Sequence, residues 1–164
     1  MMMMPEQPED AAFMQQALAL AKQAAECDEV PVGALVVLGG EVIGSGFNQP
    51  RKRHDASAHA EIEALRAAGH QLANYRLPGT TLYVTVEPCT MCLGAIIHAR
   101  CQRLVFGAPE PRYGAVVSGQ QLLAQGRYNH RLDVTGGVLA HDCGELMKAF
   151  FQARRRTPRQ GPAQ

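Results

Sequence analysis

Two cysteines three positions apart are the clearest chemical feature of this 164-residue sequence. Cys89 and Cys92 follow Pro88, where a run rich in β-branched residues gives way to a helical pattern. At the start of a helix, side chains at positions i and i+3 share one face, and the helix N-terminus favours their thiolate forms. The pair by itself is compatible with a metal site, with a redox dithiol and with coincidence.

A histidine 30 positions before Cys89 favours the metal site. His59 also stands where a polar segment gives way to a helical pattern. One imidazole and two thiolates are ligands that Zn²⁺ prefers, and a site with three protein ligands keeps one position open for water. His59, Cys89 and Cys92 therefore predict a catalytic zinc site rather than a structural one.

Glu61 adds a carboxylate to this group. Residues two positions apart on a regular helix point about 200° apart, so His59 and Glu61 can share a pocket only if His59 precedes the helical backbone. Two thiolates and a neutral imidazole already balance the charge of Zn²⁺, so Glu61 is not needed as a ligand. Its predicted task is to move protons to and from a metal-bound water.

Hydrophobic periodicity indicates the elements that must carry these residues. The expected helices span 11–26, 58–68, 90–100 and 142–155, with one helical turn at 120–124, and the expected strands span 32–38, 41–47, 80–86, 103–108 and 134–139. Gly39 and Gly40 predict a hairpin turn, and Gly69 predicts a helix end. Strand, helix and strand follow one another around the two cysteines, which predicts a layered α/β domain with a mixed sheet.

The composition is that of one globular domain, with 46% hydrophobic and 19% charged residues. The formal net charge of +1 argues against a strongly basic nucleic-acid-binding protein and against an acidic disordered one. The charges are unevenly distributed, however. Residues 1–49 contain seven acids and one base, or −6, while residues 50–164 contain 15 bases and eight acids, or +7. This asymmetry suggests an anionic partner.

Targeting signals and disulfides are not indicated. No apolar run reaches the roughly 18 residues of a membrane span, and the acidic start does not resemble a signal peptide, so we expect a cytoplasmic protein. The remaining cysteines, Cys27, Cys101 and Cys143, are expected to be ordinary thiols. We expect a single domain at 11–156 between disordered tails at 1–10 and 157–164, and we assign no structure to Met1–Met4.

The joint pattern of His59-Ala60-Glu61 and Pro88-Cys89-x-x-Cys92 resembles the motifs of zinc-dependent nucleobase deaminases. Further segments, covering nearly the whole chain, resemble the bacterial tRNA-specific adenosine deaminases, which convert adenosine to inosine at the wobble position of a tRNA anticodon. These segments are VPVGA (30–34), GFN (46–48), HD (54–55), NYRL (74–77), TLYVTVEPCTMCLGAIIHAR (81–100), VFGA (105–108), NHR (129–131) and FF (150–151). The run through residues 96–98 favours this family over guanine and deoxycytidylate deaminases.

The resemblance implies a fold, a cofactor and an activity. The fold is cytidine deaminase-like, an α/β class with three α/β/α layers and a central mixed five-stranded sheet. His59, Cys89 and Cys92 would hold one Zn²⁺ per subunit with water as the fourth ligand, and Glu61 would be the general acid/base. The reaction would be hydrolytic deamination of A34, in bacteria that of an arginine tRNA with an ACG anticodon.

The resemblance also implies substrate contacts and partners. Asn48 and the backbone N–H of Ala60 would contact the base, while Phe151 and Arg154 on the basic last helix would contact the substrate. Members of the family are homodimers whose two subunits both contact the substrate. The expected partners are therefore a tRNA anticodon stem-loop and a second copy of this chain, and no membrane is expected.

Two other function classes share parts of this pattern. A free-base or nucleotide deaminase, such as a guanine deaminase, uses the same zinc chemistry, but the basic residues at 51–54 and 154–156 argue against it. A zinc-stabilised RNA-binding or scaffold module has no use for an unligated carboxylate and usually has a fourth protein ligand. Glu61 therefore argues against the second alternative.

Overall fold

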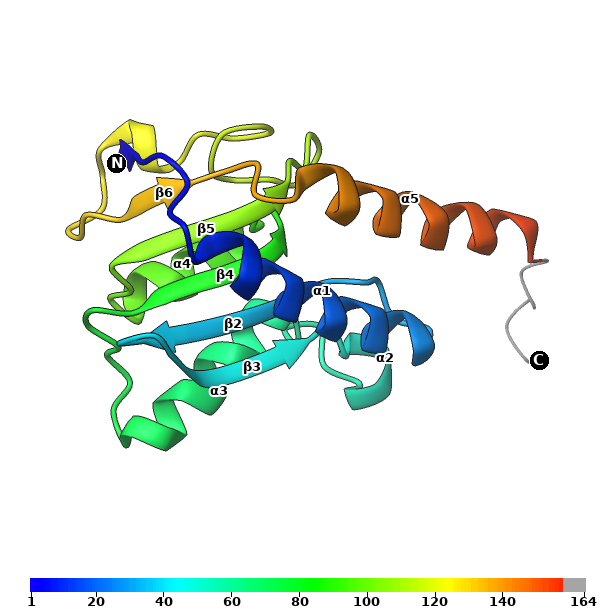
Figure 1. The fold of residues 1–164 in the computed structure, drawn as a ribbon, viewed down its shortest axis with the longest axis horizontal. Helices are drawn as coiled ribbons and strands as arrows, with labels where there is room; N and C mark the ends of the chain where they lie inside the picture. Colours follow the sequence, from blue (N-terminus) through cyan, green and yellow to red (C-terminus); the bar gives the residue numbers. More distant parts are fainter. Residues whose placement is uncertain (158–164) are drawn as a thin grey trace.

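A mixed six-stranded sheet lies between two layers of helices in the computed structural model, which describes residues 1–157 (Figure 1). The strand order is β1-β6-β5-β4-β2-β3, with β2 antiparallel to β3 and β4, and with β4, β5, β6 and β1 parallel to one another. The strands are β1 (Met2–Met3), β2 (Gly33–Leu38), β3 (Glu41–Phe47), β4 (Thr81–Val86), β5 (Arg103–Ala108) and β6 (Asp133–Thr135). The helices are α1 (Asp10–Glu26), α2 (Pro50–Arg53), α3 (Ala60–Leu72), α4 (Thr90–His98) and α5 (Ala140–Arg156), with a 3₁₀ turn at Leu123–Gln125.

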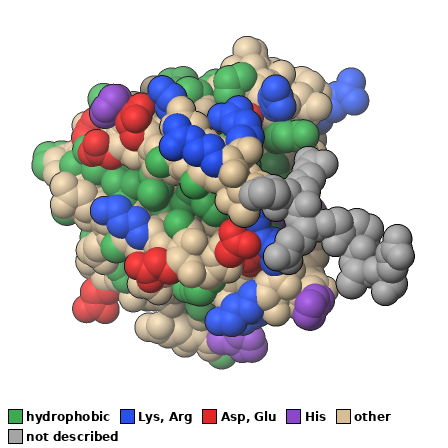
Figure 2. Space-filling model, turned by 90° about the vertical axis from the view of Figure 1, so that its right-hand side faces the viewer, with side chains coloured by type: hydrophobic (Ala, Val, Ile, Leu, Met, Phe, Trp, Pro, Cys, Tyr) green, Lys and Arg blue, Asp and Glu red, His purple; other side chains and the backbone are tan. Residues whose placement is uncertain are grey.

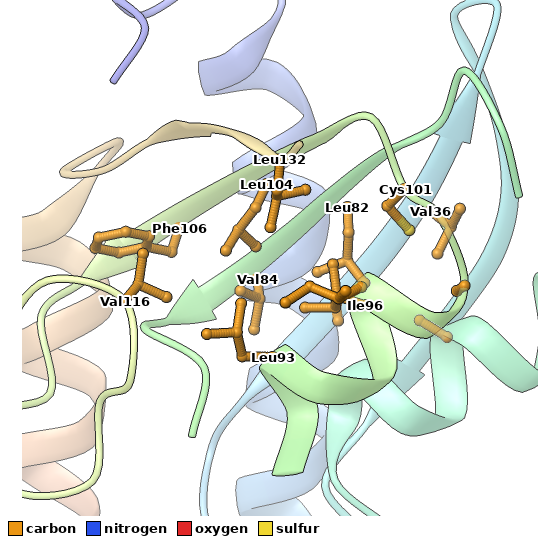
Figure 3. Close-up of a cluster of buried hydrophobic side chains, with 14 of the residues drawn as sticks. Val36, Leu82, Val84, Leu93, Ile96, Cys101, Leu104, Phe106, Val116 and Leu132 are labelled. Atoms are coloured by element: carbon orange, nitrogen blue, oxygen red, sulfur yellow. The ribbon is translucent and has the colours of Figure 1, made fainter. Parts of the chain in front are cut away.

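Successive residues of the central strands face opposite layers, because side chains alternate across a β-strand. One face packs against α3 and α4 and carries Val36, Leu82, Val84, Leu104 and Phe106 (Figure 3). The other face packs against α1 and α5 and carries Leu35, Val37, Tyr83 and Val105. The three-layer α/β/α arrangement predicted from the sequence is confirmed.

Glycine-rich turns bound these elements in two different ways. Gly39 and Gly40 have φ angles of +57° and +79°, and they form the predicted hairpin turn between β2 and β3. Gly69, however, does not end α3, which continues to Leu72. Ala73 adopts the left-handed conformation there, with φ +50°, and the N–H of Asn74 bonds to the Gly69 carbonyl. The predicted helix end was therefore wrong by about one turn.

The sheet edge at β1 and β6 differs from the expectation. The strand expected at 134–139 ends at Thr135, because Gly136 lies against the Phe106 ring, where a Cβ atom would come within 2.5 Å, and Gly137 has φ +85°. Met2 and Met3 pair with β6 and add a sixth strand, where the expected disordered tail had none. Of the expected C-terminal tail, residues 158–164 lie outside the described residues.

No helix in the described part of the chain is both long enough and apolar enough to cross a bilayer. The longest helices, α1 and α5, have 17 residues each, and most of their exposed positions carry polar or charged side chains.

Candidate metal centre and active site

His59 and Cys89 occupy equivalent places, each immediately before a helix. His59 precedes α3 with φ −73° and ψ 155°, and Cys89 precedes α4 with φ −74° and ψ 174°. The backbone is extended at both residues. Because α3 and α4 pack on the same face of the sheet and contact each other, their first turns bring His59, Cys89 and Cys92 into one cluster.

The donor atoms of this cluster fit a tetrahedral zinc ion. His59 Nδ1 lies 3.7 Å from the Sγ atom of Cys89 and 3.5 Å from that of Cys92, and the three donor atoms lie within 4.8 Å of one another. Zn–S and Zn–N bonds of about 2.3 and 2.05 Å at a tetrahedral angle separate sulfur and nitrogen by about 3.6 Å. One imidazole and two thiols are thus spaced as zinc ligands are, and they lack a fourth protein ligand among the described residues.

Hydrogen bonding within the cluster polarises the thiols and the imidazole. Hydrogen bonds from Cys92 and His59 outweigh partial burial and lower the pKa of Cys89 to about 4. The same contact with Cys89, together with burial, raises the pKa of Cys92. The pKa of His59 is raised mainly by its hydrogen bond to Cys89. The cluster therefore presents a thiolate at neutral pH, which is the form that binds a metal.

Glu61 faces the same cluster from the first turn of α3. Its side chain is buried, and His59, Cys89 and Cys92 all influence its ionisation. Burial raises the pKa of Glu61, which brings it closer to the range in which a carboxyl group both takes and gives protons near neutral pH. The extended backbone of His59 is the condition that allows His59 and Glu61 to share a pocket, as the sequence analysis required.

Asn48 and Ala60 contact each other directly. Asn48 follows β3, and its Oδ1 atom accepts the backbone N–H of Ala60 at 2.8 Å. The family resemblance implied that this N–H is offered to a base. In the structure it holds the Asn48 side chain, whose NH₂ group is left to donate.

Phe151 and Arg154 lie on the last turns of α5, which extends beyond the sheet (Figure 1). Phe151 is exposed, and Arg154 places its guanidinium 4.9 Å from the centre of the Phe150 ring. Arg154 also donates to the Asp28 carbonyl at 3.3 Å and pairs with its carboxylate at 3.4 Å. Among the described residues, no hydrogen bond or ion pair joins either side chain to the metal-ligand cluster.

The basic segment before His59 forms the short helix α2, which the sequence analysis did not predict. The buried Glu29 carboxylate accepts the backbone N–H groups of Arg51 at 3.0 Å and Lys52 at 3.5 Å and thereby caps this helix. Lys and Arg side chains lie on several sides of a hydrophobic band on the adjoining face of the molecule (Figure 2). Asp and Glu side chains lie on the same face, which therefore carries charges of both signs (Figure 2).

A second buried carboxylate beside the cluster, that of Glu87, was not assigned a role by the sequence analysis. It lies between β4 and Pro88, two positions before Cys89, and it is bonded to a loop from another part of the chain. The available signal was an acidic residue directly after a strand rich in β-branched residues. The role of Glu87 becomes apparent only in the folded structure, where the loop 110–118 bonds to its carboxylate.

A family model for MafB19-like deaminases matches residues 8–155. A tRNA-specific adenosine deaminase of Haemophilus influenzae is 48% identical over 147 residues, which cover 89% of this chain and 85% of that protein. The tRNA-specific adenosine deaminase of Bacillus subtilis is 40% identical over 148 residues, covering 90% and 92% of the two chains.

Solved structures of deaminases also resemble this chain in fold and sequence. A structure from a study of A-to-I editing by tRNA:A34 deaminases superimposes with a TM-score of 0.80 at 47% identity, covering 82% of this chain and 98% of the other. A guanine deaminase from Nitrosomonas europaea has a TM-score of 0.74 at 25% identity, covering 89% and 85%. The second protein shares the fold at a much lower sequence identity.

Proposed function

Because the chain belongs to the tRNA-specific adenosine deaminases, we propose that it converts adenosine to inosine at the wobble position, A34, of a tRNA anticodon. The observation that carries the proposal is the cluster of His59, Cys89 and Cys92 with the buried Glu61 beside it. The reaction is hydrolytic, since water replaces the amino group of adenine and ammonia leaves. We propose an arginine tRNA with an ACG anticodon as the substrate.

We propose that His59, Cys89 and Cys92 hold one Zn²⁺ per subunit. When bound, the ion lowers the pKa of a coordinated water towards 7, so that a nucleophile is present at neutral pH. Glu61 would take one proton from the attacking water and deliver it to a ring nitrogen of the base. It would then carry the second proton, from the oxygen that is now bonded to the base, to the amino group that leaves as ammonia. Burial of Glu61 supports this role, because a carboxyl group with a raised pKa both takes and gives protons near neutral pH.

Asn48 is the proposed anchor for the base. Its Oδ1 atom is occupied by the Ala60 N–H, so its side-chain NH₂ is the group that can reach a ligand. Adenine presents ring nitrogens as acceptors, which complement an amide donor. Ala60 acts in this proposal by fixing the orientation of Asn48, and its N–H is no longer counted as a free donor.

The wider RNA contact is proposed for the basic residues of α2 and for the end of α5. Arg154 offers a cation for phosphate, and the exposed Phe151 ring offers a surface for base stacking. We further propose a homodimer that acts in the cytoplasm. The half-exposed Met91 beside the small residues Gly94 and Ala95 on α4 supports a helix face that a second copy can approach.

Direct comparison of substrates tests the function. The protein, loaded with zinc, is incubated separately with four substrates. They are an anticodon stem-loop that carries A34, the same stem-loop carrying G34, free guanine, and cytosine nucleosides. We expect inosine, detected by mass spectrometry, in the A34 stem-loop alone. Ammonia release from guanine without inosine in the RNA would support the guanine deaminase alternative instead.

A further inference from the structure

Glu87 is buried without a cationic partner. Its side chain is 3% exposed, and no ion pair to it occurs among the described residues. Backbone N–H groups surround it instead. Oε2 accepts those of Val116 (3.0 Å), Val117 (2.9 Å) and Ser118 (3.0 Å), and Oε1 accepts that of Glu110 (3.2 Å).

This arrangement makes the carboxylate the centre of a loop, residues 110–118. A buried charge is costly unless hydrogen bonds compensate it, and bonds to an ionised acceptor are stronger than neutral ones. Four N–H groups from one loop supply that compensation here. The loop backbone must therefore curve around Glu87, since a different path would leave the charge buried and unbonded.

Gly114 shows how closely the loop fits the carboxylate. A Cβ atom at this position would lie 2.4 Å from the Glu110 carbonyl oxygen and 2.6 Å from Glu87 Cδ. Gly114 also forms a β-bridge with Cys89, and the next N–H, that of Ala115, bonds to the Pro88 carbonyl at 2.9 Å. The loop is thus joined through its backbone to a proposed zinc ligand.

The two sides of the loop differ in character. Val116 is buried in the same hydrophobic cluster as Phe106, which anchors the inner side (Figure 3). On the outer side Arg112 is exposed, and Tyr113 is 73% exposed. A guanidinium and a phenol ring are suited to phosphate and to a nucleobase respectively.

We propose that Glu87 is a positioning residue that shapes the loop 110–118 so that Arg112 and Tyr113 contact the RNA substrate beside the metal centre. The inference rests on the proposed function for its substrate. Glu87 acts through the loop and touches neither the metal nor the base. Because the groups proposed for the chemistry lie on other elements, loss of the loop shape should weaken RNA binding more than it slows the chemical step.

Glu87→Gln, compared with Glu41→Gln on the exposed hairpin, tests the proposal from the carboxylate side. An amide turns an N–H group towards the loop and removes the charge. We expect hydrogen exchange at the amides of residues 116–118 to accelerate on the order of tenfold or more. We also expect the KM for the A34 stem-loop to rise about tenfold, with zinc content retained and kcat within about threefold. Glu41→Gln should match the unchanged protein in all four measurements.

Gly114→Ala tests the same contact from the loop side, with Gly144→Ala on α5 as its control. A Cβ atom at Gly114 displaces the loop from Glu87, whereas the nearest atom to a Cβ at Gly144 lies 4.0 Å away. Gly114→Ala should reproduce the faster exchange and the higher KM. Should Glu87→Gln fail to fold, Gly114→Ala and Glu87→Asp decide the question with the same measurements.

Three outcomes would overturn the proposal. Unchanged exchange at residues 116–118 would show that Glu87 does not hold the loop. Faster exchange with an unchanged KM would show that the loop shape is irrelevant to RNA. A fall in kcat with loss of zinc and no change in KM would give Glu87 a purely structural role at the metal centre. If the unchanged protein fails to deaminate the RNA, the proposed function and the RNA contact are overturned, while the exchange rates still decide the anchoring.

Discussion

The two ends of the parallel strands β4 and β5 each bury a carboxylate, and they stabilise it by different means. At the end where these strands begin, Asp10 accepts two hydrogen bonds from Arg103, at 2.8 and 2.7 Å, one from the Tyr83 hydroxyl at 2.8 Å, and one from the N–H of Gln7 at 2.8 Å. At the end where they finish, Glu87 accepts four backbone N–H groups and has no cationic partner among the described residues. Asp10 is thus stabilised by a cationic side chain, and Glu87 by the backbone N–H groups of a loop.

This difference separates a stabilising region from a functional one. The Asp10 carboxylate joins side chains from α1, β4 and β5, and Arg103 continues to the Thr135 hydroxyl on β6 at 2.7 Å. Such a network holds elements together, and its side chains are buried away from any substrate. The Glu87 end leaves side chains exposed and lies next to the metal-ligand cluster. Substitutions at the two ends should therefore change different measurable quantities.

The largest effect is expected at the functional end. Glu61→Gln keeps the shape of the side chain and removes its ability to transfer protons, so kcat on the A34 stem-loop should fall by roughly 10²- to 10⁴-fold. Zinc content and the midpoint of urea unfolding should stay the same, because Glu61 is not a proposed ligand. Near-normal turnover by this variant would exclude Glu61 as the general acid/base.

A large effect on stability is expected at the other end. Asp10→Asn leaves the Arg103 guanidinium buried without a counter-charge, which should lower the free energy of unfolding by about 3 to 5 kcal/mol. The other partners of the guanidinium, the Thr135 hydroxyl at 2.7 Å and the Pro5 carbonyl at 3.5 Å, are neutral and do not replace the lost counter-charge. Urea unfolding measures the change, with the exposed neighbour Glu9→Gln as control. A loss of kcat in protein that remains folded would contradict the separation of the two ends.

The pH dependence of unfolding sharpens this prediction. Burial opposes ionisation of Asp10, but hydrogen bonds from Arg103, Gln7 and Tyr83 outweigh it and lower the pKa of Asp10 below its ordinary value of 3.8. A pKa lowered by folding stabilises the protein above the unfolded value and loses that contribution as the pH falls through the folded value. The stability difference between the unchanged protein and Asp10→Asn should thus be constant near neutral pH and shrink below about pH 4. A constant difference down to pH 2 would argue against an ionised Asp10.

The smallest effect on stability is expected for Arg154, which pairs with an exposed carboxylate. Asp28, whose side chain is 67% exposed, pairs with Arg51 and Arg154, and exposed pairs contribute little to stability. Arg154→Gln should leave unfolding nearly unchanged, weaken RNA affinity, and reduce the slope of log affinity against log salt by about one. Filter binding at several salt concentrations measures that slope. Lys148→Gln, earlier on the same helix, is the control, and an unchanged slope for Arg154→Gln would remove Arg154 from the RNA contact.

Much of the fold was predictable because local patterns match the final environment. The β-branched and aromatic residues of β4 and the Gly39-Gly40 turn favour local geometry that the tertiary structure keeps. The predicted helix end at Gly69 was wrong, since α3 continues to Leu72. The strand β6 ends earlier than expected because Gly136 lies against the Phe106 ring, which is distant in the chain. The pairing of Met2 and Met3 with β6 is similarly non-local and left no periodic signal.

By itself, the sequence determined the donor types for a metal site and their positions at two helix starts. It also determined the βαβ order that brings Cys89 and Cys92 to the end of a parallel strand pair. Only the tertiary structure decided how the polar groups are shared: the Ala60 N–H goes to Asn48, Asp10 to a guanidinium 93 positions away, and Glu87 to the loop 110–118. Residue types and spacing carry ligand chemistry, whereas a buried hydrogen bond depends on which distant groups the packed chain brings within about 3 Å.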